Sequence, residues 1–441
     1  MVSSKKNKTT TATKKKKTAS VSAAPAIKVS LDPPSKRQDR RGFELIFVGS
    51  AAVGLYALYK LTTAFAASTT IGNVVLASLL WLAVIVGVVL TVYVTDQSTR
   101  PPENDVYSFL QFQKKRQQTD GGNASKESTR PPVLVCLGDS LTHGKASSNW
   151  VDRVLPSVLT KLTAGPSTDT NGTNNKDRDS DTSTGTTQSR PSPWTHKDPL
   201  WVVNCGQNNV VSEVGLQERV GWALSCQPDA VVVLLGTNDS RALIERGWKN
   251  QLEFMWWTKE KLSLDVLEHN LDRTVETLLS QHKQTQQSSS SGGSNNKKTK
   301  SRSSSTIRVA LCTLPPMSED LNSVANHIVR LANQRIAAVA AKHHHRNCTL
   351  LDVYGAMEGQ IREQTSTRLP VGTVTLLAPL VGFCHYVCGY SFQTIASYIG
   401  HVVLLDCLHL NDVGGDLVKD LVVDFVTDKV LAESGSTKKT Q

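Results

Sequence analysis

The sequence is poor in cysteine: its 441 residues include only eight, and these follow no regular spacing. Small secreted proteins held together by a disulfide framework are far richer in cysteine, so that class is excluded. Apolar residues make up 39% and charged residues 20% of the chain. This composition excludes a collagen and a fully disordered protein, although the apolar share is slightly below the usual one and predicts some unstructured segments.

Excess positive charge is almost absent from most of the chain. The net charge is +11, but residues 1–42 hold nine Lys and three Arg against two Asp, and the remaining 399 residues carry only +1. A basic tail in front of an apolar stretch is typical of proteins in which it sets membrane orientation or touches anionic lipid. We therefore expect a disordered basic tail over residues 1–42 and no nucleic-acid partner.

Charge is missing altogether from residues 61–95. Within them, residues 74–94 supply 21 residues dense in Val, Leu, Ala and Ile, and about 20 such residues cross a bilayer as a helix. An earlier apolar segment, residues 43–59, is marginal in length, but it forms a hairpin with the second if the helix continues past Lys60. We predict a membrane anchor over residues 43–95, with one or two transmembrane helices, and hence a membrane location.

Basic residues flank both outer ends of this anchor. They are Lys36, Arg37, Arg40 and Arg41 before it and Arg100, Lys114, Lys115 and Arg116 after it. The positive-inside bias favours a hairpin with both ends, and so the C-terminal domain, in the cytosol. The alternative is a single span with that domain in a lumen, where glycosylation sequons occur at Asn123, Asn171 and Asn347.

Beyond Pro131 the chain alternates between strand and helix patterns. Short, near-continuously apolar runs predict strands of a parallel sheet covered on both faces. They are residues 133–137, 201–205, 230–235, 307–311 and 349–353. Helical spacing of apolar residues between them is clearest over 264–278 and 321–331. The pattern predicts an α/β fold, a three-layer α/β/α sandwich around a parallel, doubly wound, flavodoxin-like sheet, preceded by N-terminal transmembrane helices.

Two stretches inside this region are too polar to bury enough surface to fold. Residues 163–193 are rich in Thr, Ser, Asp and Asn, and residues 282–306 are rich in Ser, Gln and Lys. We expect both to be disordered inserts of one domain over residues 131–430. Residues 96–130 then form a linker to the anchor, and residues 431–441 a disordered tail.

Polar blocks follow directly after the first three predicted strands, and a fourth block lies near the end of the chain. They are Gly138-Asp139-Ser140-Leu141-Thr142-His143-Gly144, Gly206-Gln207-Asn208, Gly236-Thr237-Asn238-Asp239 and Asp406-Cys407-Leu408-His409-Leu410-Asn411. Ligands of an open parallel sheet bind beyond the carboxyl ends of its strands. We therefore expect these blocks to form a site.

The residue types in the blocks fit nucleophilic catalysis. Ser140 is a candidate nucleophile, and His409 is the candidate base that takes its proton. Asp406, three residues earlier, is placed to hold the other imidazole nitrogen and to stabilise the imidazolium that forms. We predict these three as catalytic, with Asp139 shaping the turn and His143 in the wall of the site.

In this order the four blocks resemble the GDSL or SGNH hydrolases, a family named for Ser, Gly, Asn and His, over about residues 131–430. The resemblance assigns the oxyanion hole to the backbone N–H groups of Ser140 and Gly206 and to the side-chain amide of Asn238. Gly206 has no Cβ to obstruct its N–H, and the amide of Asn238 donates without carrying a charge. The resemblance implies a hydrolase acting on ester bonds, without a metal or an organic cofactor.

Two apolar stretches flank the site in sequence. Residues 248–257 hold a cluster of aromatic residues, of which we expect Trp256 and Trp257 to bind substrate, and residues 369–405 contain no Asp, Glu, Lys or Arg. Both stretches suit either the core or an esterase that takes acyl chains from a membrane. The sequence predicts a membrane-anchored serine esterase or lipase-like acylhydrolase, with membrane lipid as one candidate ester. An acyltransferase or polysaccharide O-acetylesterase of the same fold is an alternative, and a non-catalytic membrane scaffold is a second.

Overall fold

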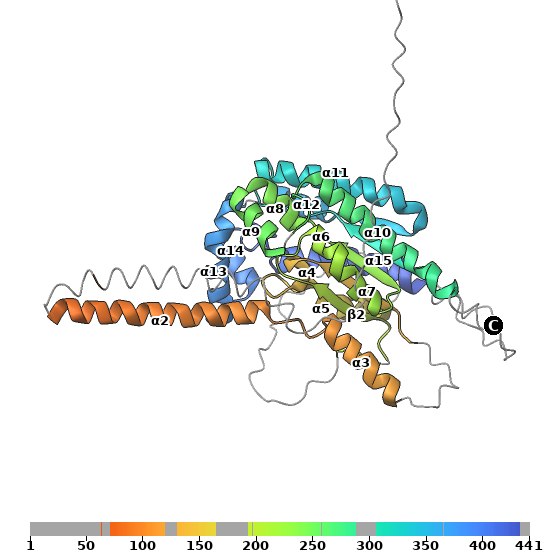
Figure 1. Ribbon diagram of the computed structural model, residues 1–441, viewed down its shortest axis with the longest axis horizontal. Coiled ribbons are helices and arrows are strands. Elements are labelled where there is room, and N and C mark those ends of the chain that lie inside the picture. The colour runs from red at the N-terminus through yellow and green to blue at the C-terminus, as the bar shows by residue number, and fades with distance from the viewer. Residues whose placement is uncertain are drawn as a thin grey trace, which may run out of the picture.

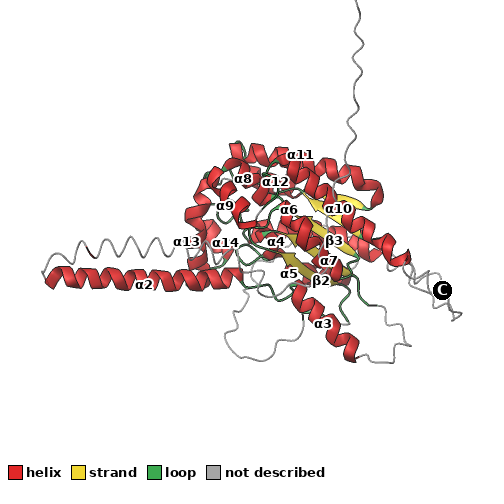
Figure 2. Cartoon of the chain, in the orientation of Figure 1, coloured by secondary structure: helices red, strands yellow, loops and turns green. Residues whose placement is uncertain are grey.

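A parallel five-stranded sheet forms the centre of the protein (Figures 1 and 2). The computed structural model describes residues 63, 71–119, 130–164, 193–195, 197–256, 258–287, 306–364 and 366–432. The strands are β1 (Val133–Gly138), β2 (Trp201–Gly206), β3 (Ala230–Leu234), β4 (Arg308–Cys312) and β5 (Cys348–Leu351). They pair in the order β2-β1-β3-β4-β5, every pair parallel. This confirms the predicted doubly wound, flavodoxin-like order.

Helices cover both faces of the sheet (Figure 2). The α-helices are α2 (Ile71–Thr99), α3 (Val106–Thr119), α4 (Ser140–His143), α5 (Trp150–Thr163), α6 (Ser212–Val214), α7 (Val220–Ser225), α8 (Thr237–Ile244), α9 (Arg246–Trp256), α10 (Leu264–Gln287), α11 (Val324–His343), α12 (Val353–Glu363), α13 (Val374–Tyr386), α14 (Phe392–Ile399) and α15 (Asp412–Phe425). Shorter 3-10 or π segments are η1 (Gly215–Arg219), η2 (His344–Arg346), η3 (Val371–Thr373) and η4 (Val426–Leu431).

The side chains of β1 show how the layers pack. Val133, Val135 and Leu137 enter one core cluster with α3, α10 and α11. Leu134 and Cys136 point the other way, into a second cluster with α5, α12 and α15. Because both faces are buried, all these positions are apolar, which is why the strands are visible in the sequence.

Helix α3 lies in the segment 96–130, where we expect only a linker. Its Phe109 is fully buried. The ring packs edge-on against Trp194 and Trp201, with ring centroids 5.0 and 5.9 Å apart. The structure therefore differs from the linker prediction, since this helix is part of the packed domain.

The expected inserts and tails lie mostly outside the described residues. Helix α10 continues to Gln287 and so enters the first few residues of the 282–306 insert. Helix α5 ends at Thr163, where the first insert is expected to begin. The basic tail, residues 1–42, also falls outside the described residues.

The apolar helix α2 projects away from the sheet (Figure 1). Its segment Trp81–Thr99 has a mean hydropathy of 1.5 and is not buried, and no other helix among the described residues is long and apolar enough to cross a membrane. Just past the end of this helix, Arg100 forms an ion pair with Asp96 at 2.6 Å, so charged residues occur again where the apolar segment ends. The second predicted span is thus a helix, whereas the first, residues 43–59, lies outside the described residues.

Candidate active site

The ends of β1, β2 and β3 bring three of the polar blocks together at one edge of the sheet. Gly138 pairs in register with Gly206 on one side and Leu234 on the other. A Cβ on Gly138 would collide with Thr142 and with the Leu234 carbonyl, and a Cβ on Gly206 would collide with the backbone of His143. Glycine at these two positions therefore lets the turn after β1 pack closely between the neighbouring strands.

Ser140 is the first residue of the short helix α4. Asp139 caps this helix by accepting a hydrogen bond from the Leu141 N–H at 3.0 Å, and burial raises the pKa of its carboxyl to about 6. Gly144 ends the helix with a φ of 77°, and His143, which we expect in the wall of the site, is buried at its last position. The N–H of Ser140 has no hydrogen-bond partner within the described part of the chain. The turn thus presents both the hydroxyl and the N–H of one residue.

His409 connects Ser140 to Asp406. The His409 Nε2 lies 3.1 Å from the Ser140 Oγ, and the His409 Nδ1 lies 2.8 Å from the Asp406 Oδ2. The other oxygen of Asp406 accepts the N–H groups of Leu408 and His409, at 3.1 and 2.8 Å, which fixes the carboxylate. With Asp406 accepting from Nδ1–H, the Nε2 faces the hydroxyl as a proton acceptor.

Asp406 and His409 are coupled electrostatically. Asp406 is fully buried, and the His409 side chain is 13% exposed. Burial opposes the charged form of each, but their mutual attraction and hydrogen bonds outweigh it, so the pKa of Asp406 is lowered and that of His409 is raised. This environment stabilises an imidazolium at His409, as proton transfer from a serine requires.

Asn238 lies at the start of α8, beyond β3. Its amide donates one hydrogen to the Val210 carbonyl at 3.0 Å, and its second N–H has no partner among the described residues. The neighbouring Asp239 accepts from the N–H and the hydroxyl of Ser212 at 2.9 and 2.6 Å, and Asn270 donates to the same hydroxyl at 3.0 Å. These contacts anchor the segment that orients the Asn238 amide.

The other expected binding residues make contacts within the fold. The Gly206 N–H donates to the Asn204 side-chain oxygen at 2.9 Å, so the donor expected in the oxyanion hole already has a partner in this structure. Trp256 is partly buried against the core and donates its indole N–H to the Asn209 carbonyl at 2.8 Å. Trp257 lies outside the described residues. The binding roles of Gly206 and both tryptophans stay predictions.

A buried carboxylate that the sequence analysis missed holds the loop carrying Asp406 and His409. Glu319, beyond β4, is 2% exposed and accepts the backbone N–H groups of residues 402–404 at 2.8 to 3.0 Å. The loop then closes on itself, with the Leu405 N–H donating to the His409 carbonyl at 2.7 Å. The sequence signal for Glu319 is its place after a strand at the same sheet edge, but its partners lie more than 80 residues away.

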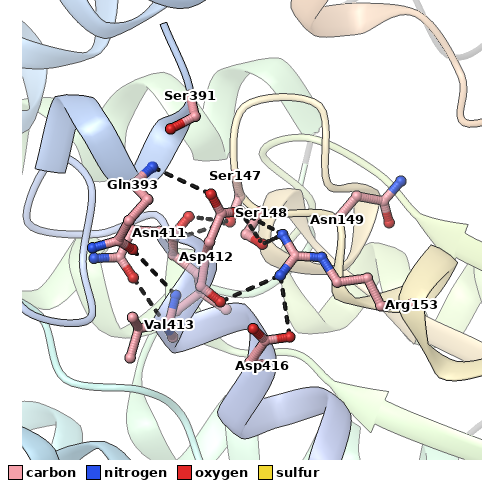
Figure 3. A network of polar contacts seen from close by, with 12 residues as sticks. Ser147, Ser148, Asn149, Arg153, Ser391, Gln393, Asn411, Asp412, Val413 and Asp416 are labelled. Atoms are coloured by element: carbon pink, nitrogen blue, oxygen red, sulfur yellow. Dashed lines mark hydrogen bonds and ion pairs between the residues drawn. The ribbon is translucent and has the colours of Figure 1, made fainter. Parts of the chain in front are cut away.

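A polar network ties the loop after α4 to the start of α15 (Figure 3). The Ser147 hydroxyl accepts the Leu410 N–H at 2.9 Å, and the Ser148 N–H donates to the Leu410 carbonyl at 2.8 Å. Arg153 from α5 donates to both the Ser148 hydroxyl and the Asp412 carboxylate. The network thereby fixes the loop that carries the imidazole relative to the helix that carries the serine.

Comparisons with known proteins match the same region. Residues 136–414, which contain all four polar blocks, match the model of the GDSL-like lipase/acylhydrolase family. No curated protein sequence matches the chain.

Several solved structures are similar to the chain. The acetyl xylan esterase AlAXEase is 15% identical, with 67% of this chain and 99% of that chain covered and a TM-score of 0.36. A catalytic mutant of the acetylxylan esterase Axe2 from Geobacillus stearothermophilus is 11% identical, with coverages of 67% and 94% and a TM-score of 0.37. The lipase/acylhydrolase from Enterococcus faecalis is 16% identical, with coverages of 67% and 95% and a TM-score of 0.35.

Proposed function

Because the chain belongs to the GDSL-like lipase/acylhydrolase family and is thereby a hydrolase of ester bonds, we propose that it is a membrane-anchored serine esterase working through an acyl-Ser140 intermediate. The observation that carries this proposal is the hydrogen-bonded chain from Ser140 through His409 to Asp406, at 3.1 and 2.8 Å. It joins a nucleophile, a base and a residue that orients the base, which is the arrangement that serine acyl transfer needs.

In the acylation step, the Ser140 Oγ attacks the carbonyl carbon of the ester while its proton passes to the His409 Nε2. Asp406 stabilises the imidazolium through Nδ1–H. The negative charge that develops on the carbonyl oxygen is met by the Ser140 N–H and by the second N–H of the Asn238 amide. The C–O bond to the alcohol then breaks, and the alcohol leaves with the proton from His409.

Deacylation repeats these steps with water. His409, neutral again, takes a proton from a water molecule that attacks the acyl-Ser140 carbonyl, and the same donors stabilise the second oxyanion. Collapse of this intermediate breaks the bond to the Ser140 Oγ, which recovers its proton from His409. The products are a carboxylic acid and an alcohol.

Hydrolysis of p-nitrophenyl butyrate by the full-length protein tests this function. Ser140→Ala should abolish turnover, because no other group takes the place of the nucleophile. Ser225→Ala is a matched control, since among the described residues that hydroxyl bonds the Gly221 carbonyl within α7 and no group of the site. Undiminished turnover by Ser140→Ala would contradict the proposal.

The anchor and its orientation form the membrane part of the proposal. Helix α2 supports it by its length, its composition and its exposure. The basic residues on both sides of the anchor favour a cytosolic domain. The protein should therefore stay with the membrane after alkaline carbonate extraction, and glycosidase should leave its mobility unchanged even though Asn347 is exposed. Extraction into the supernatant would refute the anchor, and a mobility shift would place the domain in a lumen.

A further inference from the structure

We propose that α13 and α14 form a second membrane contact beside α2, and that this contact presents the active site to esters held in a lipid bilayer. The inference rests on the proposed esterase function and names its substrate class, acyl esters of membrane lipids. It commits to a bilayer surface as the partner of the exposed apolar side chains on these two helices.

Helix α13 carries apolar side chains on more than one face, and the described part of the protein covers these faces unequally. The inner face packs on the domain through Val374 and Leu377. The outer face carries Leu380 and Phe383, which are 54% and 36% exposed, and Val387, directly after the helix, is 41% exposed. Their spacing of three and four residues places them in one stripe along the helix. The described part of the protein therefore covers this row of large apolar groups only in part.

The position of α13 against α2 determines how deep in a bilayer this stripe would lie. The two helices lie in contact at the junction between α2 and the domain (Figure 1). A Cβ at Gly382 would collide with the side chain of Val94, so the lack of a side chain at Gly382 lets Val94 pack directly against α13. Val94 lies within the apolar segment of α2 and two residues before Asp96, about 3 Å along a helix axis. If α2 spans a bilayer, the exposed stripe of α13 lies at its boundary, where amphipathic helices bind membranes.

The chain beyond α13 has the composition of such a boundary. Tyr390 and Tyr398 are 48% and 83% exposed, with ring centroids 6.5 Å apart. Tyrosine is enriched where membrane and water meet. Residues 369–405 contain no Asp, Glu, Lys or Arg, so no charged side chain from this segment opposes insertion.

The same two helices are attached to the loops of the active site. The Tyr386 hydroxyl donates to the Lys145 carbonyl, in the loop after α4. At the other end of α13, Thr373 lies 3.3 Å from the sulfur of Cys407, the residue after Asp406. The Gln393 N–H in α14 donates to Asp412 at 3.3 Å (Figure 3). A bilayer that holds α13 and α14 therefore lies next to the loops that carry the serine and the imidazole.

The first test compares two esters with one pair of variants. Full-length protein is reconstituted in phosphatidylcholine vesicles that contain a fluorogenic long-chain ester, and hydrolysis of water-soluble p-nitrophenyl acetate is measured in parallel. Leu380→Ser combined with Phe383→Ser should lower hydrolysis of the vesicle-borne ester by about tenfold or more and leave the soluble ester unaffected. The matched control is Leu162→Ser combined with Leu159→Ser on α5, at exposed leucines of 51% and 40%.

The outcomes separate the contact from the catalytic function. Unchanged hydrolysis of both esters by the α13 variant would overturn the membrane contact, as would an equal loss from the α5 control. Failure of the wild type to cleave either ester would refute the proposed esterase instead.

A second measurement does not depend on activity or on any variant. A photoactivatable phosphatidylcholine in the vesicles should label both α2 and the 380–398 segment of the wild-type protein, mapped by mass spectrometry. Labelling of α2 alone would overturn the proposed contact and leave the anchor standing. Labelling of neither segment would refute the anchor as well.

Discussion

Asn238→Ala is the substitution whose effect on catalysis follows most directly from the geometry. One amide hydrogen of Asn238 is used by the Val210 carbonyl, and the other, unpaired among the described residues, can donate to the oxyanion. Loss of one such donor raises the barrier by about 3 kcal/mol, which is about a 100-fold loss in kcat. Because the donor acts on the transition state, kcat and kcat/KM should fall together with little change in KM.

The same substitution has a separate cost in stability. It leaves the buried Val210 carbonyl without its partner, which costs about 1–3 kcal/mol. Asn333→Ala is the matched control, because its amide also donates to a backbone carbonyl, that of Leu314, at 3.0 Å. We expect both variants to lose stability in thermal unfolding, and only Asn238→Ala to lose turnover.

Asn238→Asp sharpens the test, since it keeps the shape of the side chain and replaces the donor by a carboxylate. A negative charge beside the oxyanion should reduce kcat more than the alanine does. Wild-type turnover in Asn238→Ala, or equal turnover losses in Asn238→Ala and Asn333→Ala, would refute the oxyanion role.

Three further substitutions test the site and the fold. Asp406→Asn removes the charge that raises the pKa of His409, so the acid limb of kcat/KM should move to lower pH than in the wild type. The value of kcat should fall by up to about 10⁴-fold, and an acid limb that does not move would contradict this coupling. Glu319→Gln keeps an oxygen that accepts the N–H groups of residues 402–404 but loses the negative charge. It should lower the free energy of unfolding by about 1–2 kcal/mol and lower kcat at constant KM. An unchanged melting temperature would argue against a stabilising role of the Glu319 hydrogen bonds to residues 402–404. Phe109→Ala should lower the free energy of unfolding, measured with denaturant, by about 3–5 kcal/mol. The same substitution in an unpacked linker helix would change it by almost nothing.

The sequence predicts the sheet well because β1 to β4 are buried almost throughout, whereas the edge strand β5 exposes Leu350 by 38%. Continuous apolar runs mark all five strands, and the flavodoxin-like order follows from the repeated βαβ pattern. Helix α3 escapes prediction because Gln and Lys dominate its second half and only its first turns reach the core. In α11 the helix is confirmed, but the buried face uses Ala325 and Val329, whereas Val324 is 73% exposed. Small alanines on an inner face weaken the apolar periodicity on which the prediction depends.

The candidate site is predictable where its residues follow strands and hidden where the backbone supplies the partners. Ser140 and Asn238 stand directly beyond β1 and β3, so the strand-end rule places them together. The clamp by Glu319 could not be predicted, because its partners are N–H groups that every residue but proline carries. Nor does the sequence reveal that the Gly206 N–H is taken up by Asn204.

Mapping a covalent adduct tests most directly whether Ser140 is a nucleophile activated by His409. Wild-type protein treated with a fluorophosphonate and digested for mass spectrometry should carry the phosphonyl group on Ser140. His409→Ala should abolish that adduct while the protein stays folded, because the hydroxyl then loses the imidazole that lies 3.1 Å away. An adduct on a different residue of the wild type, or undiminished labelling of Ser140 in His409→Ala, would contradict the account.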